Sequence, residues 1–154
     1  MKKFIFITPI LLLFIFAVGC GGQCKVTGKV TLTDGTPLTH GEVLFESDNM
    51  VAKGSINTDG TYRMGTTKPG NGVPKGDYRV YLLATADNKF RGPDGNLYTI
   101  EEMNEKRAQW GNVGSPMPIA IPVIQGKYES PHTSGLECKV TGSLVFNIEL
   151  EPAT

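Results

Sequence analysis

The sequence predicts an all-β fold, an antiparallel β-sandwich of about seven strands with one short helix in a long insertion. Two observations support this fold class. Short stretches of alternating apolar and polar residues recur along the chain, which is the period-two pattern of strands with one buried face. Turn sequences separate them, and the chain holds 19 Gly and 10 Pro in 154 residues. Short strands joined by tight turns bury their apolar faces well when two sheets pack together.

Most of the predicted strands lie in the first half of the chain. The first alternates, with Val26 and Val30 on its inner face, and the Asp34-Gly35 pair ends it. A second Asp-Gly pair, at 59–60, marks another turn, since Gly supplies the positive φ that tight turns need. The strands predicted in this half are residues 25–32, 42–46 and 50–57, a short strand around Tyr62, and residues 78–83.

Residues 86–118 lack the strand pattern and are predicted to form a long insertion outside the sandwich. Within them, Thr99 and Glu102 are spaced as a capping box, which predicts a helix that ends at Gln109 or Trp110. Such insertions on a rigid scaffold often carry binding surfaces.

Two further strands are predicted after the insertion. Residues 119–124 contain Pro122, which favours an edge strand or an irregular one. Residues 143–151 alternate strictly and close the sandwich. The predicted central core residues are Val30, Phe45, Tyr62, Val80, Phe146 and Ile148.

The first twenty residues have the form of an export signal. Lys2 and Lys3 precede an apolar run at 4–18, and small residues lead to Cys20. The run is shorter than the roughly 20 residues of a spanning helix, which argues against the alternative of an uncleaved membrane anchor. The cysteine after a small residue resembles the bacterial lipobox. This resemblance implies a signal peptide at 1–19, lipidation of Cys20 and a lipidated tether at 20–23.

The predicted location follows from that motif. A lipid on Cys20 makes the membrane a partner and places the protein in the cell envelope, on the periplasmic face or the cell surface. Gly21, rather than Asp, follows the cysteine. By resemblance to the enterobacterial sorting rule, this favours the outer membrane, and the inner membrane stays open.

Composition limits the other classes of function. Without residues 1–19, 135 residues remain, enough for one sandwich domain at 24–151 that includes the insertion at 86–118. The shortened chain carries 13 Lys and Arg against 15 acids, a net charge near −2. No nucleic-acid partner is expected, since such partners need clustered basic charge.

Two cysteines remain besides Cys20. Cys24 and Cys138 each begin the pentapeptide Cys-Lys-Val-Thr-Gly. An even pair in an exported chain predicts a disulfide, which would close a loop of about 115 residues and contribute on the order of 4 to 5 kcal/mol. The alternative is two free buried thiols.

Five short motifs follow one another along the first half of the chain: Val26-x-Gly28-x-Val30, Asp34-Gly35-x-Pro37-Leu38, Gly41-x-Val43, Thr58-Asp59-Gly60-x-Tyr62 and Pro74-x-Gly76-x-Tyr78-x-Val80. This series resembles a known module, the carboxypeptidase regulatory-like domain. The resemblance implies a transthyretin-like or prealbumin-like, Ig-like sandwich and covers about residues 24–83, with a weaker match in the last strand. With the lipobox, the chain also resembles small lipoproteins of planctomycete-type bacteria.

No enzyme, cofactor or metal is predicted. A related transthyretin-like branch hydrolyses 5-hydroxyisourate with a Tyr-Arg-Gly-Ser tail, which this sequence lacks. Asp34 and Asp59 are single acids in turns rather than a calcium loop. His40 and His132 lack the third ligand that zinc sites need. Ser134 does not stand in a nucleophile-elbow sequence.

The candidate binding residues all lie in the insertion: Phe90, Arg91, Tyr98, Arg107 and Trp110. Aromatic and arginine side chains are common anchors of protein interfaces, and aromatics also stack on sugars. The first hypothesis is a structural or protein-interaction module of the envelope, with envelope proteins as partners. The alternative is a module that binds carbohydrate, such as envelope glycans, or small peptides. A third reading is that Tyr98, Met103 and Trp110 only cap an open end of the sandwich.

Overall fold

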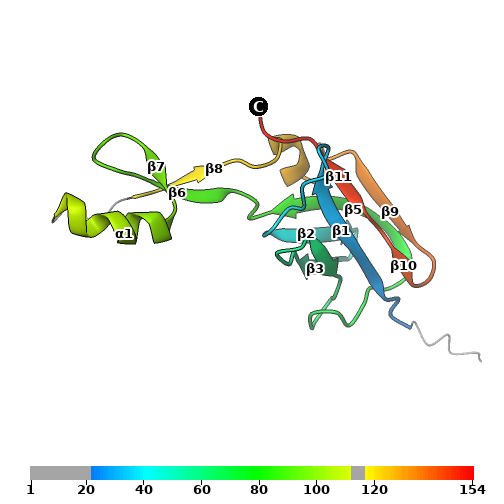
Figure 1. The fold of residues 1–154 in the computed structure, drawn as a ribbon. Helices are drawn as coiled ribbons and strands as arrows, with labels where there is room; N and C mark the ends of the chain where they lie inside the picture. Colours follow the sequence, from blue (N-terminus) through cyan, green and yellow to red (C-terminus); the bar gives the residue numbers. More distant parts are fainter. Residues whose placement is uncertain (1–21, 112–116) are drawn as a thin grey trace, which may run out of the picture.

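The computed structural model describes residues 22–111 and 117–154, so Cys20 and the predicted signal peptide lie outside the described residues. Figure 1 shows two parts, a β-sandwich and an arm that extends from one side of it. Strands dominate the described chain, and its one α-helix lies in the arm. The predicted fold class, a β-sandwich with a short helix in an insertion, is confirmed.

The first sheet of the sandwich is built around β1. Strand β4 pairs with one side of β1 in antiparallel orientation, and β10 and β11 follow one another along its other side in parallel orientation. These strands are β1 (Val26–Leu32), β4 (Thr61–Arg63), β10 (Leu144–Val145) and β11 (Ile148–Leu150).

The closing segment differs from its prediction in two ways. Residues 143–151 form two short strands instead of one, and both run parallel to β1. The break falls at Phe146 and Asn147, where the side-chain Oδ1 of Asn147 accepts a hydrogen bond from the Lys29 amide at 3.0 Å. A side-chain acceptor replaces the backbone acceptor there, which interrupts the ladder.

The second sheet is fully antiparallel and has the order β3-β2-β5-β9. Its inward residues follow the predicted alternation, since Val43 and Phe45 are buried opposite Leu82 and Val80. The strands are β2 (Glu42–Ser47), β3 (Met50–Ser55), β5 (Gly76–Leu83) and β9 (Leu136–Val140), and a 3₁₀ turn, η1 (Gly126–Glu129), precedes β9.

The core lies between the two sheets. Five of the six predicted central residues are buried, whereas Phe146 is only half-buried at the edge of the cluster. Phe146 still packs edge-on against Phe45, with ring centroids 5.8 Å apart. The alternation continues across the break, with Leu144, Phe146, Ile148 and Leu150 on the inner face, so Phe146 faces the core but lies at its border.

Gly28 permits a close approach between β1 and the closing segment. A Cβ at this position would lie 1.9 Å from the Phe146 carbonyl oxygen. That oxygen also accepts a hydrogen bond from the Tyr62 hydroxyl on β4. Burial raises the pKa of Tyr62, which keeps the hydroxyl a donor.

The predicted disulfide is not formed in the structure, where Cys24 and Cys138 are both free and buried. Cys138 belongs to β9 of the second sheet, where it pairs with Tyr78. Cys24 instead pairs with Val73 just before β1. Burial raises the pKa of the Cys138 thiol, which disfavours the reactive thiolate.

The insertion differs from its prediction. Residues 86–118 were expected to hold a helix but no strands, yet β6 pairs with both β7 and β8 in a small antiparallel sheet. The expected edge strand at 119–124 is shorter and forms an edge of this sheet. We define the arm as β6 (Asp87–Arg91), β7 (Leu97–Tyr98), α1 (Ile100–Trp110) and β8 (Pro118–Ile121).

Candidate functional site on the arm

The helix of the arm begins at the predicted capping box. The Thr99 side chain accepts a hydrogen bond from the Glu102 amide at 3.2 Å, and the Glu102 carboxylate accepts one from the Thr99 amide at 2.7 Å. The bond from the Thr99 backbone holds the pKa of Glu102 below its usual value. This reciprocal cap satisfies two amides that the first turn leaves unpaired. The predicted end at Trp110 is also confirmed.

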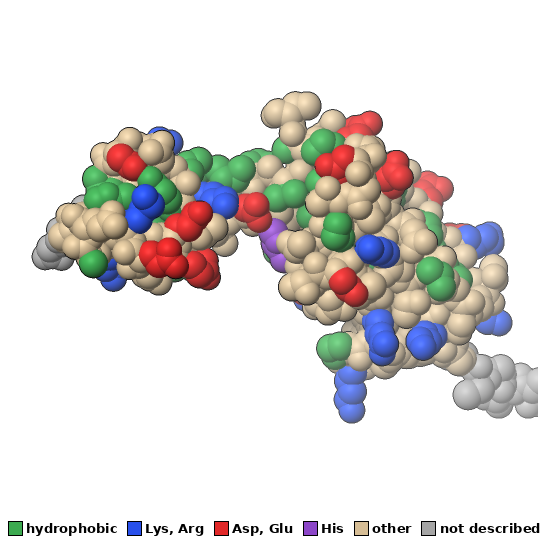
Figure 2. All heavy atoms as spheres, viewed as in Figure 1, with side chains coloured by type: hydrophobic (Ala, Val, Ile, Leu, Met, Phe, Trp, Pro, Cys, Tyr) green, Lys and Arg blue, Asp and Glu red, His purple; other side chains and the backbone are tan. Residues whose placement is uncertain are grey.

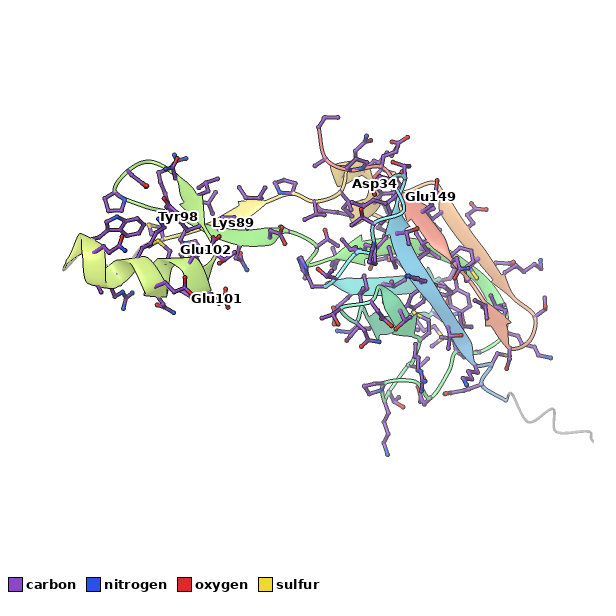
Figure 3. All side chains as sticks on the ribbon, in the orientation of Figure 1. Asp34, Lys89, Tyr98, Glu101, Glu102 and Glu149 are labelled. Atoms are coloured by element: carbon purple, nitrogen blue, oxygen red, sulfur yellow. The ribbon has the colours of Figure 1, made fainter. Side chains whose placement is uncertain are left out.

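An aromatic pair joins the helix to the small sheet. The rings of Tyr98 and Trp110 meet edge-on with centroids 5.2 Å apart. The ammonium of Lys106 lies 5.0 Å from the Tyr98 ring and 5.7 Å from the Trp110 ring. Figure 3 shows the side chains of the arm between the helix and the sheet. Met103, on the same helix, is buried. Together with Tyr98, Lys106 and Trp110 it forms a small core of the arm itself.

Hydrogen bonds to Asp94 fix the loop between β6 and β7. Its carboxylate accepts bonds from the Tyr98 hydroxyl and from the Asn96 side chain, and the Tyr98 bond is the main reason that the pKa of Asp94 is lowered. Gly92 lies tightly against this cluster, because a Cβ there would lie 2.6 Å from the Asp94 carboxylate and 2.9 Å from Trp110. The hydrogen bond to Asp94 and the close packing at Gly92 therefore fix the position of the Tyr98 ring against the loop.

The five predicted binding residues are all in the arm, but only some are close together. Tyr98 and Trp110 are in contact and half-buried, and Phe90 is paired with Tyr98 across β6 and β7. Arg91 is exposed and donates a hydrogen bond to the Gly95 carbonyl at 2.9 Å. Arg107 is exposed on the helix.

Three exposed apolar residues of the arm were missed by the sequence reasoning. Leu97, Ile100 and Met117 expose 42%, 42% and 83% of their surface. A signal was available for two of them, since Leu97 follows the turn residues before β7 and Ile100 follows the helix-cap residue Thr99, where apolar side chains find little to pack against. Figure 2 shows hydrophobic side chains on the surface of the arm.

The aromatics do not cap an open end of the sandwich. The helix packs mainly against β6 and β7, and Figure 1 shows it held apart from both sandwich sheets. The capping interpretation is therefore wrong for Tyr98, Met103 and Trp110, because the arm sheet that these residues cover is their own.

Residues 84–86 connect the sandwich strand β5 to the arm strand β6. Ala84 has a positive φ of 53°, which turns the chain out of β5. His40 holds the outgoing strand, since its Nε2 lies 3.3 Å from the Ala86 carbonyl oxygen and 3.7 Å from the Asp87 carboxylate. This geometry sets the direction in which the arm leaves.

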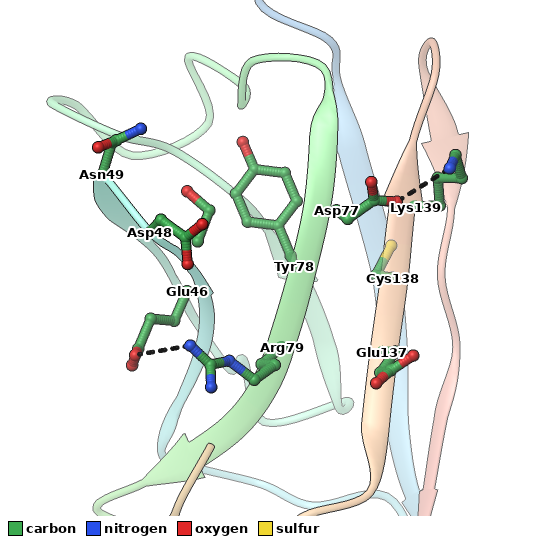
Figure 4. A pocket seen from close by; sticks show the side chains of 10 residues that line it. Glu46, Asp48, Asn49, Asp77, Tyr78, Arg79, Glu137, Cys138 and Lys139 are labelled. Atoms are coloured by element: carbon green, nitrogen blue, oxygen red, sulfur yellow. Dashed lines mark ion pairs between the residues drawn. The ribbon is translucent and has the colours of Figure 1, made fainter. Parts of the chain in front are cut away.

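The sandwich itself offers an open polar groove of about 800 Å³ over the outer face of β2, β5 and β9 (Figure 4). Cross-strand ion pairs line it, with Arg79 3.8 Å from Glu46 and Lys139 3.2 Å from Asp77. Paired charges directly opposite one another stabilise a sheet. The groove therefore resembles an ordinary solvated sheet face more than a ligand site.

Asp34 and Asp59 have the turn role that the sequence predicted. Each carboxylate accepts a hydrogen bond from the amide two residues on, at 2.8 Å for Thr36 and 3.0 Å for Thr61, and these threonines lower the pKa of both acids. Within residues 22–111 and 117–154, no three His, Cys, Asp or Glu side chains are grouped to hold a metal ion. In the same ranges, no helix is long and apolar enough to cross a membrane.

Comparisons with known proteins assign no family. No family model matches the chain, and no curated protein matches it. Among solved structures, the chain is similar to BcpA, the major pilin subunit of Bacillus cereus, with a TM-score of 0.39 and 10% identity over 85% of this chain. It is also similar to a 9R-lipoxygenase from Cyanothece, with a TM-score of 0.33 and 15% identity over 84% of this chain. The chain spans 30% of the pilin and 16% of the lipoxygenase, and likenesses this distant carry no functional conclusion.

Proposed function

We propose that this chain is a non-enzymatic, lipid-anchored protein of the cell envelope whose sandwich is a scaffold and whose arm contacts another protein. The observation that carries the proposal is the arm itself. It projects from the sandwich and exposes the apolar side chains of Leu97, Ile100 and Met117. Several exposed apolar side chains on one projecting segment are typical of interaction sites, and the arginines of the arm are common interface anchors.

The anchor is supported by the sequence that ends at Cys20. Two or more acyl chains would hold the protein firmly, because each buried methylene contributes about 0.8 kcal/mol. Gly21 after the cysteine favours the outer membrane as the location. The motif series over residues 24–83 supports a sandwich of the carboxypeptidase regulatory-like class, in which the two Asp-Gly turns border β1 and β4.

The anchor is tested by the intact mass of protein extracted from membranes, beside a Cys20→Ser variant. We expect a chain that begins at Cys20 and is heavier by a diacylglyceryl group and an acyl group. The variant should lack this added mass. An unmodified or uncleaved chain in the unsubstituted protein would overturn the proposed anchor.

The contact surface is tested by a photo-crosslinking amino acid placed at Ile100 in the full chain expressed in cells. A matched control carries it at Val145, which is 70% exposed on β10 of the sandwich. We expect discrete protein adducts from position 100 that are lost when Leu97 and Met117 are changed to Ser. Equal adducts from both positions, or none from position 100, would remove the arm as the contact surface.

Carbohydrate or small-peptide binding through Phe90, Tyr98 and Trp110 is the alternative. It has weaker support, because Lys106 lies over both rings of the aromatic pair and the Tyr98 ring packs edge-on against Trp110. Less ring surface is then free to stack on a sugar. A glycan array that shows binding by the unsubstituted protein and none by Trp110→Ala would favour this alternative over a protein partner.

A further inference from the structure

Basic residues gather at the end of the sandwich where the described chain begins. Lys25 precedes β1, Arg63 ends β4, and Lys68 and Lys75 lie in the loop between β4 and β5. All four are exposed, and none forms an ion pair with a described residue. We call these four residues the basic end. Figure 2 shows Lys and Arg side chains around this lower end of the sandwich.

Contacts close to Gln23 hold the basic end together. The Gln23 side chain donates a hydrogen bond to the Thr66 hydroxyl at 3.1 Å, and Cys24 pairs with Val73 through two backbone hydrogen bonds. The loop that carries Lys68 and Lys75 is thereby attached to the point where the chain enters the sandwich. The four basic residues therefore lie on the same surface of the sandwich as the point where the chain enters it.

The opposite end of the sandwich is acidic. Asp34 follows β1, Glu149 lies on β11, and Figure 3 shows both at the upper end. Asp59 in the turn before β4 adds to this charge, as does Glu151, which Lys127 partly compensates. Among the described residues, acids also lie near the basic end: Asp48, Asp77, and Glu42, which lines the same pocket as Arg63 and Lys68. Two of them are paired with lysines outside the basic end, Asp77 with Lys139 at 3.2 Å and Glu42 with Lys53 at 4.0 Å. Positive charge therefore remains in excess at the entry point.

We propose that the basic end docks on the anionic lipid headgroups of the membrane to which the chain is anchored. This inference rests on the proposed lipid anchor at Cys20. Gln23 is three positions after Cys20, a span of roughly 10 Å when fully extended. This span is an upper limit and is comparable with the Debye length of about 8 Å in physiological salt, so the tether lets the basic end approach the headgroups to a distance at which their attraction is not screened. Each basic residue near an anionic surface contributes roughly a fivefold preference for it.

Docking would also orient the arm. Figure 1 shows the arm leaving the sandwich on the side away from the entry point. With the basic end against the headgroups, α1 and the exposed apolar residues of the arm stay clear of the lipid surface and accessible to a partner protein.

The test uses lipidated, full-length mature protein reconstituted in two kinds of vesicle, pure phosphatidylcholine and phosphatidylcholine with 30% phosphatidylglycerol. An amine-reactive reagent labels the lysines, and mass spectrometry compares the labelling rate of Lys25 with that of Lys89 on the arm. We expect Lys25 to be labelled several-fold more slowly on the anionic vesicles, while Lys89 stays unchanged. The protection should disappear in 0.5 M NaCl.

A pair of charge-matched variants gives the specific control. Lys68→Gln with Lys75→Gln should weaken docking roughly 25-fold, by two basic residues' contributions, and abolish the protection of Lys25. Lys89→Gln with Arg107→Gln removes the same charge from the arm and should leave the protection intact. Equal protection in both variants would overturn the docking surface.

Flotation of the vesicles separates this proposal from the anchor. Protein that floats with both kinds of vesicle in 0.5 M NaCl is anchored by lipid, and absence of Lys25 protection would then overturn the docking alone. Protein that does not float in high salt would overturn the anchor and the docking that rests on it.

Discussion

The sandwich and the arm are stabilised by different means. In the sandwich, strands far apart in the sequence pair around a core that includes Val30, Phe45 and Val80, all fully buried. No residue of the arm belongs to that core, and Met103 is the one apolar side chain buried among the arm's described residues. The arm depends instead on a helix cap, a short sheet and hydrogen bonds to Asp94. We infer that the sandwich supplies the stability, which leaves the arm surface free for contact.

The largest effect is expected in the sandwich core. Phe45→Ala should lower the free energy of unfolding by about 3 to 5 kcal/mol, because Phe45 is fully buried and packs against Tyr78 and Phe146. Denaturant unfolding measures this change. Phe146→Ala is the matched control and should cost less, since Phe146 is half-buried. A larger loss for Phe146 would contradict the placement of the core.

The next effect concerns the close approach at β1. Gly28→Ala should destabilise the sandwich by about 1 to 3 kcal/mol, because the new methyl group would overlap the Phe146 carbonyl and force the closing segment away. Thermal or denaturant unfolding reports the loss. Gly142→Ala, where nothing lies within 4 Å of the added carbon, should change stability little. Equal effects of the two substitutions would contradict the parallel pairing of β1 with the closing segment.

A smaller effect, confined to the arm, is expected at the helix cap. Thr99→Ala should weaken α1 by about 1 kcal/mol, because the Glu102 amide loses its acceptor. Amide exchange of the first helical turn should accelerate, while the denaturant midpoint of the sandwich stays fixed. Thr99→Ser keeps the acceptor and should restore protection. A shifted sandwich midpoint would mean that the two parts unfold together.

The smallest effect is a pH dependence of the arm. The pKa values of Asp94 and Glu102 are lowered in the folded arm by the Tyr98 hydroxyl and the Thr99 backbone, respectively. The stability that these two ionised carboxylates give the folded arm is therefore fully present above their pKa values in the unfolded chain, near pH 4. It is lost as the pH falls through their lower pKa values in the folded arm. Exchange protection of the arm should decline below about pH 4. Asp94→Asn with Glu102→Gln should flatten this decline, and an unchanged decline would assign it to other groups.

Sequence reasoning worked where structure is set locally. The turns at Asp34 and Asp59 and the cap at Thr99 are made by residues two or three positions apart, and all three are confirmed. The alternating strands of the sandwich were also predicted, because one buried face imposes period two on the sequence.

Long-range pairing was harder to predict. The β6–β8 pair of the arm joins segments on either side of the helix, and its short strands carry no clear alternation. The break at Asn147 and the parallel pairing to β1 depend on a partner more than a hundred positions away in sequence. For the candidate site, the insertion and its aromatics were identified, but the exposed Leu97, Ile100 and Met117 became visible only once the packing of the arm was known.

The separation of the two parts is tested most directly by native-state amide hydrogen exchange at increasing, sub-denaturing concentrations of guanidinium chloride. The account predicts that the Val80 amide exchanges only through global unfolding, with a steep dependence on denaturant. The Met103 amide, bonded to the Thr99 carbonyl at 3.0 Å, should exchange through a local opening of lower free energy that depends little on denaturant. If Met103 instead exchanges with the same free energy and denaturant dependence as Val80, the arm and the sandwich form one cooperative unit, and the account is contradicted.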